Sequence, residues 1–388
     1  MAGRPRSPQQ EKFFDELKEW SEIKLRILTK YFDAYRRKRG ASNSILYYID
    51  GFAGAGWYGD DPTTHEEGSP VRLARMADEI VRSGQPYRLV CLNYEINLTW
   101  FTQLRQALSP FDSSVVRCTH GAFEDHLPGI LTTVGQAPAL FFLDPFGVSP
   151  IRLVDLQPIL RRRDTEILLN LNTPRLRQMA GFHDSRPSGE RDAKLRLVSE
   201  VLGESTKDPN PRWLQQYRRM DTASWEDWAA NAYMESLLEQ GSELRYAVAY
   251  PIRERFRAKA KYYLVFATRS DDAVVLMNDF VCIEEDDLFA KSEGVTKTGQ
   301  LTLDGPLRES DREQALEDLL DEIHAYGVTH QGCSRTGLTK HFAGEKFGQF
   351  KQKHYRQAIN RLVEDGRAAF PNGRRNDTAP ITFLSVRA

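Results

Sequence analysis

The chain has 388 residues, 40% of them apolar and 28% charged, with a formal net charge of −1. This is the composition of an ordinary globular protein with ample material for a core, and its near-zero net charge gives no overall sign of a polyanionic partner. Residues 1–14 lack the apolar segment of a secretion signal, and no stretch approaches the roughly 20 apolar residues of a membrane span. We therefore expect no contact with membranes.

Cysteine and histidine spacing points to neither a disulfide framework nor a metal site. The four cysteines are Cys91, Cys118, Cys282 and Cys333, and none forms a CxxC pair. Such isolated cysteines are typical of reduced thiols, so we expect a cytoplasmic protein. The eight histidines show no ligand spacing, and we expect no metal.

The predicted elements begin with a helix and then alternate. Apolar side chains recur every three or four residues over 12–39, which predicts an amphipathic helix within an N-terminal segment, 1–44. Strands are predicted within 45–50, 87–95, 114–123, 138–147, 165–172, 244–254 and 261–270, and helices within 69–84, 97–110, 150–162 and 271–281. This alternation is typical of a parallel sheet covered by helices on both faces. We expect an α/β, Rossmann-like domain over 45–285, with a polar helical insertion over 174–240.

The C-terminal part has a different pattern. An acidic stretch, 286–312, is predicted to be a linker. Three predicted helices at 313–327, 334–344 and 351–366, followed by a turn-rich hairpin segment, indicate a winged helix-turn-helix domain over 313–388. From Arg335 to Ala388 there are 11 Lys/Arg and 4 Asp/Glu, which favours nucleic-acid contact. Many winged helices contact proteins instead, so both alternatives remain open.

A glycine-rich turn, "DGFAGAG", directly follows the first predicted strand. Gly51, Gly54 and Gly56 permit a tight turn and a close approach of the backbone to a ligand, although a purely structural turn has the same pattern. There is no G-K-[ST] sequence, so this is not a P-loop. Asp50 would repel a pyrophosphate and attract a cationic ligand.

Acids also follow two later strands. Glu95 ends the next strand, where nucleoside-binding α/β folds place the acceptor for ribose hydroxyls, although a solvated acid would look the same. The apolar strand at 138–143 leads into Asp144-Pro145-Phe146-Gly147. The Asp144 carboxylate and the Pro145 carbonyl can accept hydrogens from an exocyclic amine, while the Phe146 ring stacks on a base. A capped strand end is the alternative.

Together these motifs resemble those of class I S-adenosylmethionine methyltransferases. More narrowly, "YYIDGFAGAGWY", "EEGSPVRLA", "LFFLDPFG" and "YYLVFATRSDDAVVLMND" look like the three-Cys-motif partner (TcmP) proteins over residues 15–285. "DPFGVSP" is similar to a stretch of tRNA guanine-N2 dimethyltransferases, and "EGSPVRLA" to one of ribosomal-RNA adenine-N6 methyltransferases. The resemblance implies a seven-stranded class I methyltransferase sheet, S-adenosylmethionine as cofactor, and a neighbouring cysteine-motif protein as partner.

The resemblance also assigns site residues. Cofactor contacts fall on Asp50, Gly51, Phe52, Gly54, Gly56, Ser69, Glu95, Phe123, Glu124 and Lys24, and catalytic roles on Asp144, Pro145 and Phe146, with Gly147 at the substrate. From their position at the next strand end, Asn170 and Asn172 are expected to line the acceptor pocket. The acid usual after Gly121 is missing, because Ala122 stands there. Arginines within 161–163 and 174–179 suit phosphate, but also suit solvated helix ends.

Two functions stay open at this point. The first is methylation of an exocyclic amine of a DNA or RNA base, with the winged helix aiding substrate binding. The second is a non-catalytic cofactor- or nucleoside-binding protein that acts through its winged helix and its partner. The Asp144 motif favours the first, because a sensor has no need of an acid on the acceptor side.

Overall fold

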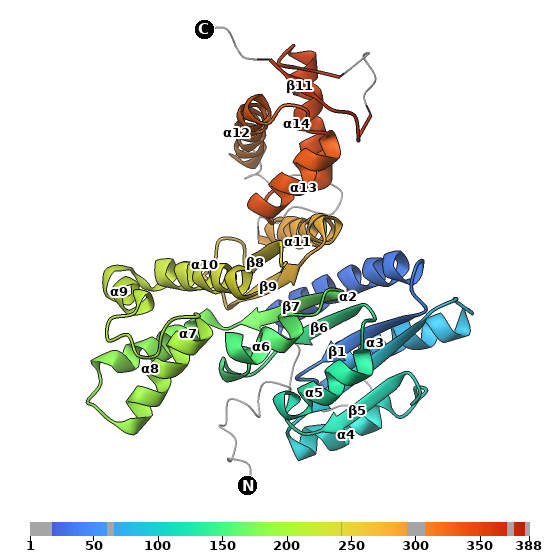
Figure 1. Ribbon diagram of the computed structural model, residues 1–388, viewed down its shortest axis with the longest axis vertical. Helices are drawn as coiled ribbons and strands as arrows, with labels where there is room; N and C mark the ends of the chain where they lie inside the picture. The colour runs from blue at the N-terminus through green and yellow to red at the C-terminus, as the bar shows by residue number, and fades with distance from the viewer. Residues whose placement is uncertain (1–17, 60–65, 242, 293–306, 371–375, 385–388) are drawn as a thin grey trace. The chain divides into compact units, whose positions relative to one another are not determined.

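The computed structural model describes residues 18–59, 66–241, 243–292, 307–370 and 376–384 (Figure 1). The chain divides into two compact units: residues 1–254 with 258–269, called here the first unit, and residues 255–257 with 270–388, called the second unit. Among the described residues, every helix is too short or too polar to cross a membrane.

A seven-stranded sheet forms the middle of the first unit, in the order β5-β4-β1-β6-β7-β9-β8. The strands are β1 (Ile45–Asp50), β4 (Arg88–Glu95), β5 (Val116–His120), β6 (Ala139–Leu143), β7 (Thr165–Leu171), β8 (Tyr246–Ile252) and β9 (Tyr262–Thr268). The first five are parallel, and β9 runs antiparallel to both β7 and β8. The seven-stranded Rossmann-like sheet predicted from the sequence is confirmed.

The strand order locates the ligand site. From β1 the chain adds β4 and β5 on one side and then crosses to add β6 and β7 on the other. Such a reversal opens a crevice at the carboxyl ends of the strands, where open α/β sheets bind ligands. Asp50, Glu95 and Asp144 all stand at or directly after these carboxyl ends.

Helices cover the sheet. They are α2 (Glu19–Gly40), α3 (Ser69–Arg82), α4 (Leu98–Leu108), α5 (Phe123–Val134), α6 (Leu153–Leu160) and the short 3-10 helix η1 (Ser149–Ile151). Helix α2 contacts β1, β8 and α3, and its side chains Ile27, Leu28 and Phe32 are fully buried. The predicted amphipathic helix is therefore part of the core; its first residues, 12–17, lie outside the described residues.

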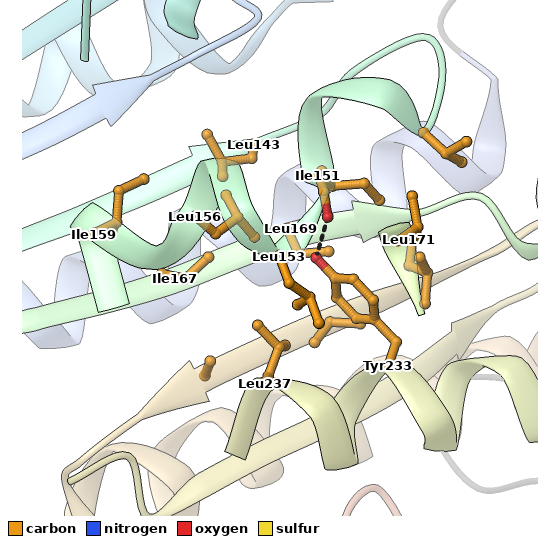
Figure 2. Close-up of a cluster of buried hydrophobic side chains, with 14 of the residues drawn as sticks. Leu143, Ile151, Leu153, Leu156, Ile159, Ile167, Leu169, Leu171, Tyr233 and Leu237 are labelled. Atoms are coloured by element: carbon orange, nitrogen blue, oxygen red, sulfur yellow. Dashed lines mark hydrogen bonds between the residues drawn. The ribbon is translucent and has the colours of Figure 1, made fainter. Parts of the chain in front are cut away.

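The segment predicted as an insertion is helical, but its last helix belongs to the core. It contains α7 (Thr173–Ala180), η2 (Gly181–Asp184), α8 (Gly189–Val201), α9 (Arg212–Arg219) and α10 (Thr222–Gln240). Trp225 and Tyr233 of α10 are fully buried in the same apolar cluster as Leu143 of β6. Figure 2 shows the Tyr233 hydroxyl, which donates a hydrogen bond to the Ile151 carbonyl at 2.9 Å. Helix α10 thus holds the turn that follows β6.

The second unit contains α11 (Asp271–Ser292), α12 (Leu307–Thr329), α13 (Arg335–Glu345), α14 (Gln352–Glu364) and the antiparallel pair β10 (Ala368–Ala369) and β11 (Thr382–Phe383). The three predicted tail helices are present in the predicted order. Leu319, Phe342 and Ile359, one from each of them, meet in one buried cluster. The name winged helix stays a prediction.

The linker prediction for 286–312 was wrong at both ends. Helix α11 continues to Ser292 and α12 begins at Leu307, while 293–306 lie outside the described residues. The acidic end of α11 is helical because it packs within the second unit, where Asp286 pairs with Lys351 at 2.7 Å. Asn278 of the same helix donates to the Phe350 carbonyl at 2.7 Å. The boundary between the units accordingly falls after Arg269, not after residue 285.

Candidate functional site

A cavity of about 810 Å³ lies at the carboxyl end of the sheet in the first unit. This volume is within the range of small-molecule sites, about 300–1,000 Å³. The predicted site residues that line it are Lys24, Phe52, Gly54, Gly56, Ser69, Asp144, Pro145, Phe146, Gly147, Asn170 and Asn172. Residues separated by up to 148 positions in sequence (Lys24 to Asn172) therefore share one space.

Several further lining residues were missed by sequence reasoning: Trp20, Ser21, Trp57, Tyr58, Lys261 and Tyr262. They belong to α2, the strand after the glycine turn, and the start of β9 with the residue before it. Arg175 and Gln178 of the segment 174–179, whose arginines were candidates for phosphate contact, also line the cavity. Lys261 stacks on the Trp20 ring, with its Nζ 4.7 Å from the ring centroid. Nothing in their local sequence marks them, because segments distant in the chain bring them together; the Tyr262 hydroxyl of β9, for example, donates to the Trp20 carbonyl of α2 at 3.0 Å.

The glycine turn is held folded by a small strand pair. Gly54 and Gly56 have φ values of +63° and +84°, a region that favours glycine. After them β2 (Trp57–Tyr58) pairs with β3 (Glu66–Glu67), and the Gly68 amide donates to the Gly56 carbonyl at 2.9 Å. A Cβ on Gly68 would lie only 2.9 Å from that oxygen. Glycine at 68 therefore lets the turn close onto the start of α3.

Asp50 supports the turn from beneath it. The residue is fully buried and is not among the residues that line the cavity. Its carboxylate accepts hydrogen bonds from the Ser69 hydroxyl (2.7 Å), the Tyr48 hydroxyl (3.0 Å) and the Phe52 amide (3.2 Å). Burial raises the pKa of this carboxyl to about 6. The carboxylate therefore ties β1, the turn and α3 together, and the direct ligand contact expected from the sequence stays a prediction.

Glu95 has a similar supporting position. Its carboxylate accepts the Gly54 amide at 2.9 Å and the Asn97 amide at 2.6 Å, and only 5% of the residue is exposed. Glu95 is therefore the partner that attaches the glycine turn to the end of β4. It does not line the cavity, so the expected contact with ribose hydroxyls stays a prediction.

Three other expected cofactor contacts do not reach the cavity. Phe123 is buried in the apolar core, with ring centroids 6.3 Å from Tyr94 and 6.4 Å from Phe141. Glu124, whose pKa is raised by burial, and Gly51 are also absent from the lining. Phe123 is drawn inward because a large apolar ring is stabilised by burial, which the pattern around it did not reveal.

Asp144 is held from two sides. Lys24, on α2, forms an ion pair with its Oδ2, and the Asn170 amide nitrogen donates to its Oδ1 at 2.7 Å. The Lys24 side chain is only 2% exposed, whereas 19% of the Asp144 side chain remains accessible. The Lys24 Nζ also lies 5.6 Å from the centre of the Tyr262 ring. Lys24 lines the cavity, so its expected contact with a cofactor stays a prediction, and the structure adds a direct contact with the acid.

Asn170 lines the cavity and has one acceptor atom without a partner among the described residues. Its nitrogen must face the Asp144 carboxylate, because an oxygen there would be repelled. Its Oδ1 is buried and has no hydrogen-bond partner among the described residues. A buried acceptor without a partner is costly, so this oxygen is suited to a ligand N–H. Asn172, by contrast, caps α7, where its Oδ1 accepts the Arg175 amide at 3.0 Å.

Phe146 provides a flat apolar face. The residue is 42% exposed, and its ring centroid lies 5.2 Å from that of Trp100. An exposed aromatic ring beside two acceptor groups is an arrangement that suits a planar base with an amine.

The cations of the C-terminal tail are mostly neutralised within the second unit. Ion pairs join Lys340 to Asp272, Lys346 to Glu322, Lys351 to Asp286, Arg361 to Glu317 and Arg367 to Asp321. Residues 270–388 as a whole contain 20 Asp/Glu and 15 Lys/Arg. The positive charge counted over the tail is therefore offset by α11 and α12, which the tail sequence alone does not show.

No family model matches this chain, and no curated protein is similar enough to count as a match. Solved structures to which it is similar include the O-methyltransferase TomG from Streptomyces achromogenes in complex with SAM (14% identity, 67% of this chain and 92% of that chain, TM-score 0.31). Others are the plantazolicin methyltransferase BamL in complex with a triazolic desmethylPZN analog and SAH (12%, 68% and 92%, TM-score 0.31) and the DszA carbon methyltransferase (11%, 65% and 55%, TM-score 0.33). These similarities are too distant to identify a reaction or a substrate.

Proposed function

We propose that this chain is an S-adenosylmethionine-dependent methyltransferase that acts on an exocyclic amine of a nucleic-acid base. The observation that carries the proposal is the cavity itself. It joins the glycine turn at Gly54 and Gly56 to the Asp144-Pro145-Phe146 turn. A cofactor on the first turn and an amine on the second would meet there. The motif resemblance to three-Cys-motif partner proteins supports the same assignment and implies a neighbouring cysteine-motif protein as partner.

The residues present fit this cofactor. Phe52, Gly54, Gly56 and Ser69 line the side of the cavity that would hold its methionine part. The buried carboxylates of Asp50 and Glu95 and the half-buried carboxylate of Asp144 outnumber the single buried cation, Lys24, in this part of the described structure, so the local charge attracts a cation. When bound, the cofactor supplies an electrophilic methyl group on a positively charged sulfur.

The acceptor side orients the amine. The Asp144 carboxylate and the Asn170 Oδ1 accept hydrogens from the same NH₂ group, and the Phe146 ring stacks on the base that carries it. Accepting these hydrogens directs the amine lone pair toward the methyl group, and the apolar walls exclude water. Lys24 keeps Asp144 in the orientation that this task needs.

A labelling experiment tests the proposal. The protein is incubated with tritiated S-adenosylmethionine and separate pools of DNA, tRNA, ribosomal RNA and protein. We expect label in one nucleic-acid pool, and Asp144→Asn should abolish transfer while calorimetry shows unchanged cofactor affinity. Asp318→Asn, an exposed acid on α12, is the matched control and should transfer normally.

The outcomes separate the candidate functions. Tight cofactor binding without label in any pool would favour the non-catalytic partner protein. Label only in the protein pool would refute the nucleic-acid substrate. Undiminished transfer by Asp144→Asn would remove Asp144 from the site.

A further inference from the structure

We propose that the helices next to the cavity, residues 173–220 (α7, η2, α8 and α9), bind the sugar-phosphate backbone of the substrate strand, in place of the basic C-terminal tail. This inference rests on the proposed nucleic-acid substrate and names the surface that would hold it. We call residues 173–220 the helical wall.

The helical wall forms one side of the cavity. Arg175, Gln178 and Met179 of α7 and Leu197 of α8 line it, next to Asn170 and Asn172 at the end of β7. Figure 1 shows α7 continuing from β7 with α8 and α9 around it, and α7 contacts both of these helices. A strand whose base reaches Asp144 would therefore lay its adjoining phosphates along α7 and α8.

The helical wall carries uncompensated positive charge. Residues 173–220 contain 10 Lys/Arg and 6 Asp/Glu. Four exposed cations form no ion pair or side-chain hydrogen bond with any described residue: Arg186, Arg196, Lys207 and Arg219. Within the part of the chain that the structure describes, Arg175, at the cavity, has the neutral Gln178 as its one side-chain partner. Free guanidinium groups of this kind are the groups that proteins use for phosphate contacts.

The arginines of different helices gather at η2. The Arg218 guanidinium lies 3.0 Å from the His183 ring nitrogen, and that of Arg191 donates to the His183 carbonyl at 3.4 Å. Arg186 follows η2 by two residues, and Arg219 is next to Arg218. The chain segments that carry the free cations Arg186 and Arg219 therefore both adjoin η2 and its contact with Arg218.

The C-terminal tail offers far fewer unpaired cations for phosphate contacts among its described residues. Of the eight Lys/Arg between residues 335 and 370, seven form ion pairs within the second unit, and Lys353 is the exception among these described residues. A paired cation must break its ion pair before it can contact a phosphate, and the free energy of that ion pair is lost. The local count of basic residues therefore overstates the attraction for a polyanion.

Salt-dependent binding tests the inference. Fluorescence anisotropy measures the affinity of the full chain for a fluorescein-labelled single-stranded oligonucleotide pool at several salt concentrations. The variant Arg186→Gln/Arg196→Gln/Arg219→Gln is compared with Lys340→Gln/Lys353→Gln/Arg356→Gln in the tail. Because each phosphate contact on a single strand contributes about 0.7 to the slope of log K against log salt, loss of three contacts should lower the slope by about 2.

We expect the first variant to bind at least about tenfold more weakly and the tail variant to bind within about twofold of the unchanged protein. All three proteins should keep the same thermal unfolding midpoint and the same cofactor affinity by calorimetry. A loss confined to the tail variant, or no binding by the unchanged protein, would overturn the inference. Failure of the proposed function would show separately, as absent cofactor binding or absent label in every pool.

Discussion

Replacing Lys24 by methionine removes the cation that neutralises Asp144 while keeping a long, unbranched side chain in the same buried place. Loss of one partner from a buried ion pair typically costs about 3–5 kcal/mol, because the other charge is left uncompensated. Since 19% of the Asp144 side chain is exposed, water can reach the carboxylate. We therefore expect the lower end of this range, about 3 kcal/mol, in the unfolding free energy of the first unit.

The same change should affect methyl transfer more than cofactor binding. Without Lys24, the Asn170 amide is the one remaining partner of the Asp144 carboxylate among the described residues, and a displacement of about 1 Å at a reacting group can cost about 100-fold in rate. We expect Lys24→Met to lower transfer of label about 100-fold at saturating cofactor. Its cofactor Kd, measured by calorimetry, should stay within about threefold.

A double variant supplies the control. In Lys24→Met/Asp144→Asn both charges are gone, so we expect urea unfolding to show most of the lost stability restored while transfer stays absent. A Lys24→Met protein with unchanged stability and unchanged transfer would refute the role of the ion pair. A large loss of cofactor affinity with normal maximal transfer would instead return Lys24 to the cofactor contact expected from the sequence.

Burial raises the pKa of the Glu166 carboxyl from 4.5 to about 7, so the folded state binds this proton more tightly than the unfolded state. The unfolding free energy, measured in urea, should therefore fall by up to about 3 kcal/mol as the pH rises from about 4.5 to 7. Glu166→Gln should remove this fall, and a variant whose stability still falls by the same amount between pH 5 and pH 8 would contradict the prediction. Gly68→Ala should destabilise the first unit by about 1–3 kcal/mol and weaken cofactor binding, because the new Cβ would press on the Gly56 carbonyl. Gly129→Ala is the matched control, since there is open space around Gly129. Equal stability and equal cofactor affinity of the two variants would be contrary evidence. Tyr233→Phe leaves the Ile151 carbonyl without its hydrogen-bond donor and should lower the unfolding free energy by about 1–2 kcal/mol; a neutral result would show that water replaces the hydroxyl.

The elements themselves could be predicted because their signals are local. Strand β1 has the predicted bounds, 45–50, since a run of apolar residues closed by an acid and glycines is legible within a few positions. The helices of the C-terminal part were found from apolar spacing in the same way. The error at 286–312 arose because acidic residues resemble a linker when the cations that pair with them lie elsewhere in the chain.

In the candidate site, too, the features that depend on local sequence were predicted and those that depend on distant segments were not. Gly54, Gly56 and Asp144 were recognisable from their positions after strands, because parallel strands bring their carboxyl ends to one edge of the sheet. That Asp50 and Glu95 hold the glycine turn from beneath, and do not face the cavity, depends on hydrogen bonds to groups from other segments. No local sequence pattern shows which groups will donate hydrogen bonds to a carboxylate, or whether that carboxylate will face the cavity.

The sequence by itself determined the seven strands of the sheet, most of the helices and the two strand-end turns of this protein, since these depend on residues close together in the chain; α5 (Phe123–Val134) and the β2–β3 pair were not predicted. Only the tertiary structure decided that Lys24 meets Asp144 across 120 positions, that Trp20 and Lys261 join one cavity wall, and that five cations of the tail pair with acids of α11 and α12. These contacts depend on how distant elements pack against each other, and the free energy that selects one packing comes from the burial of the whole core.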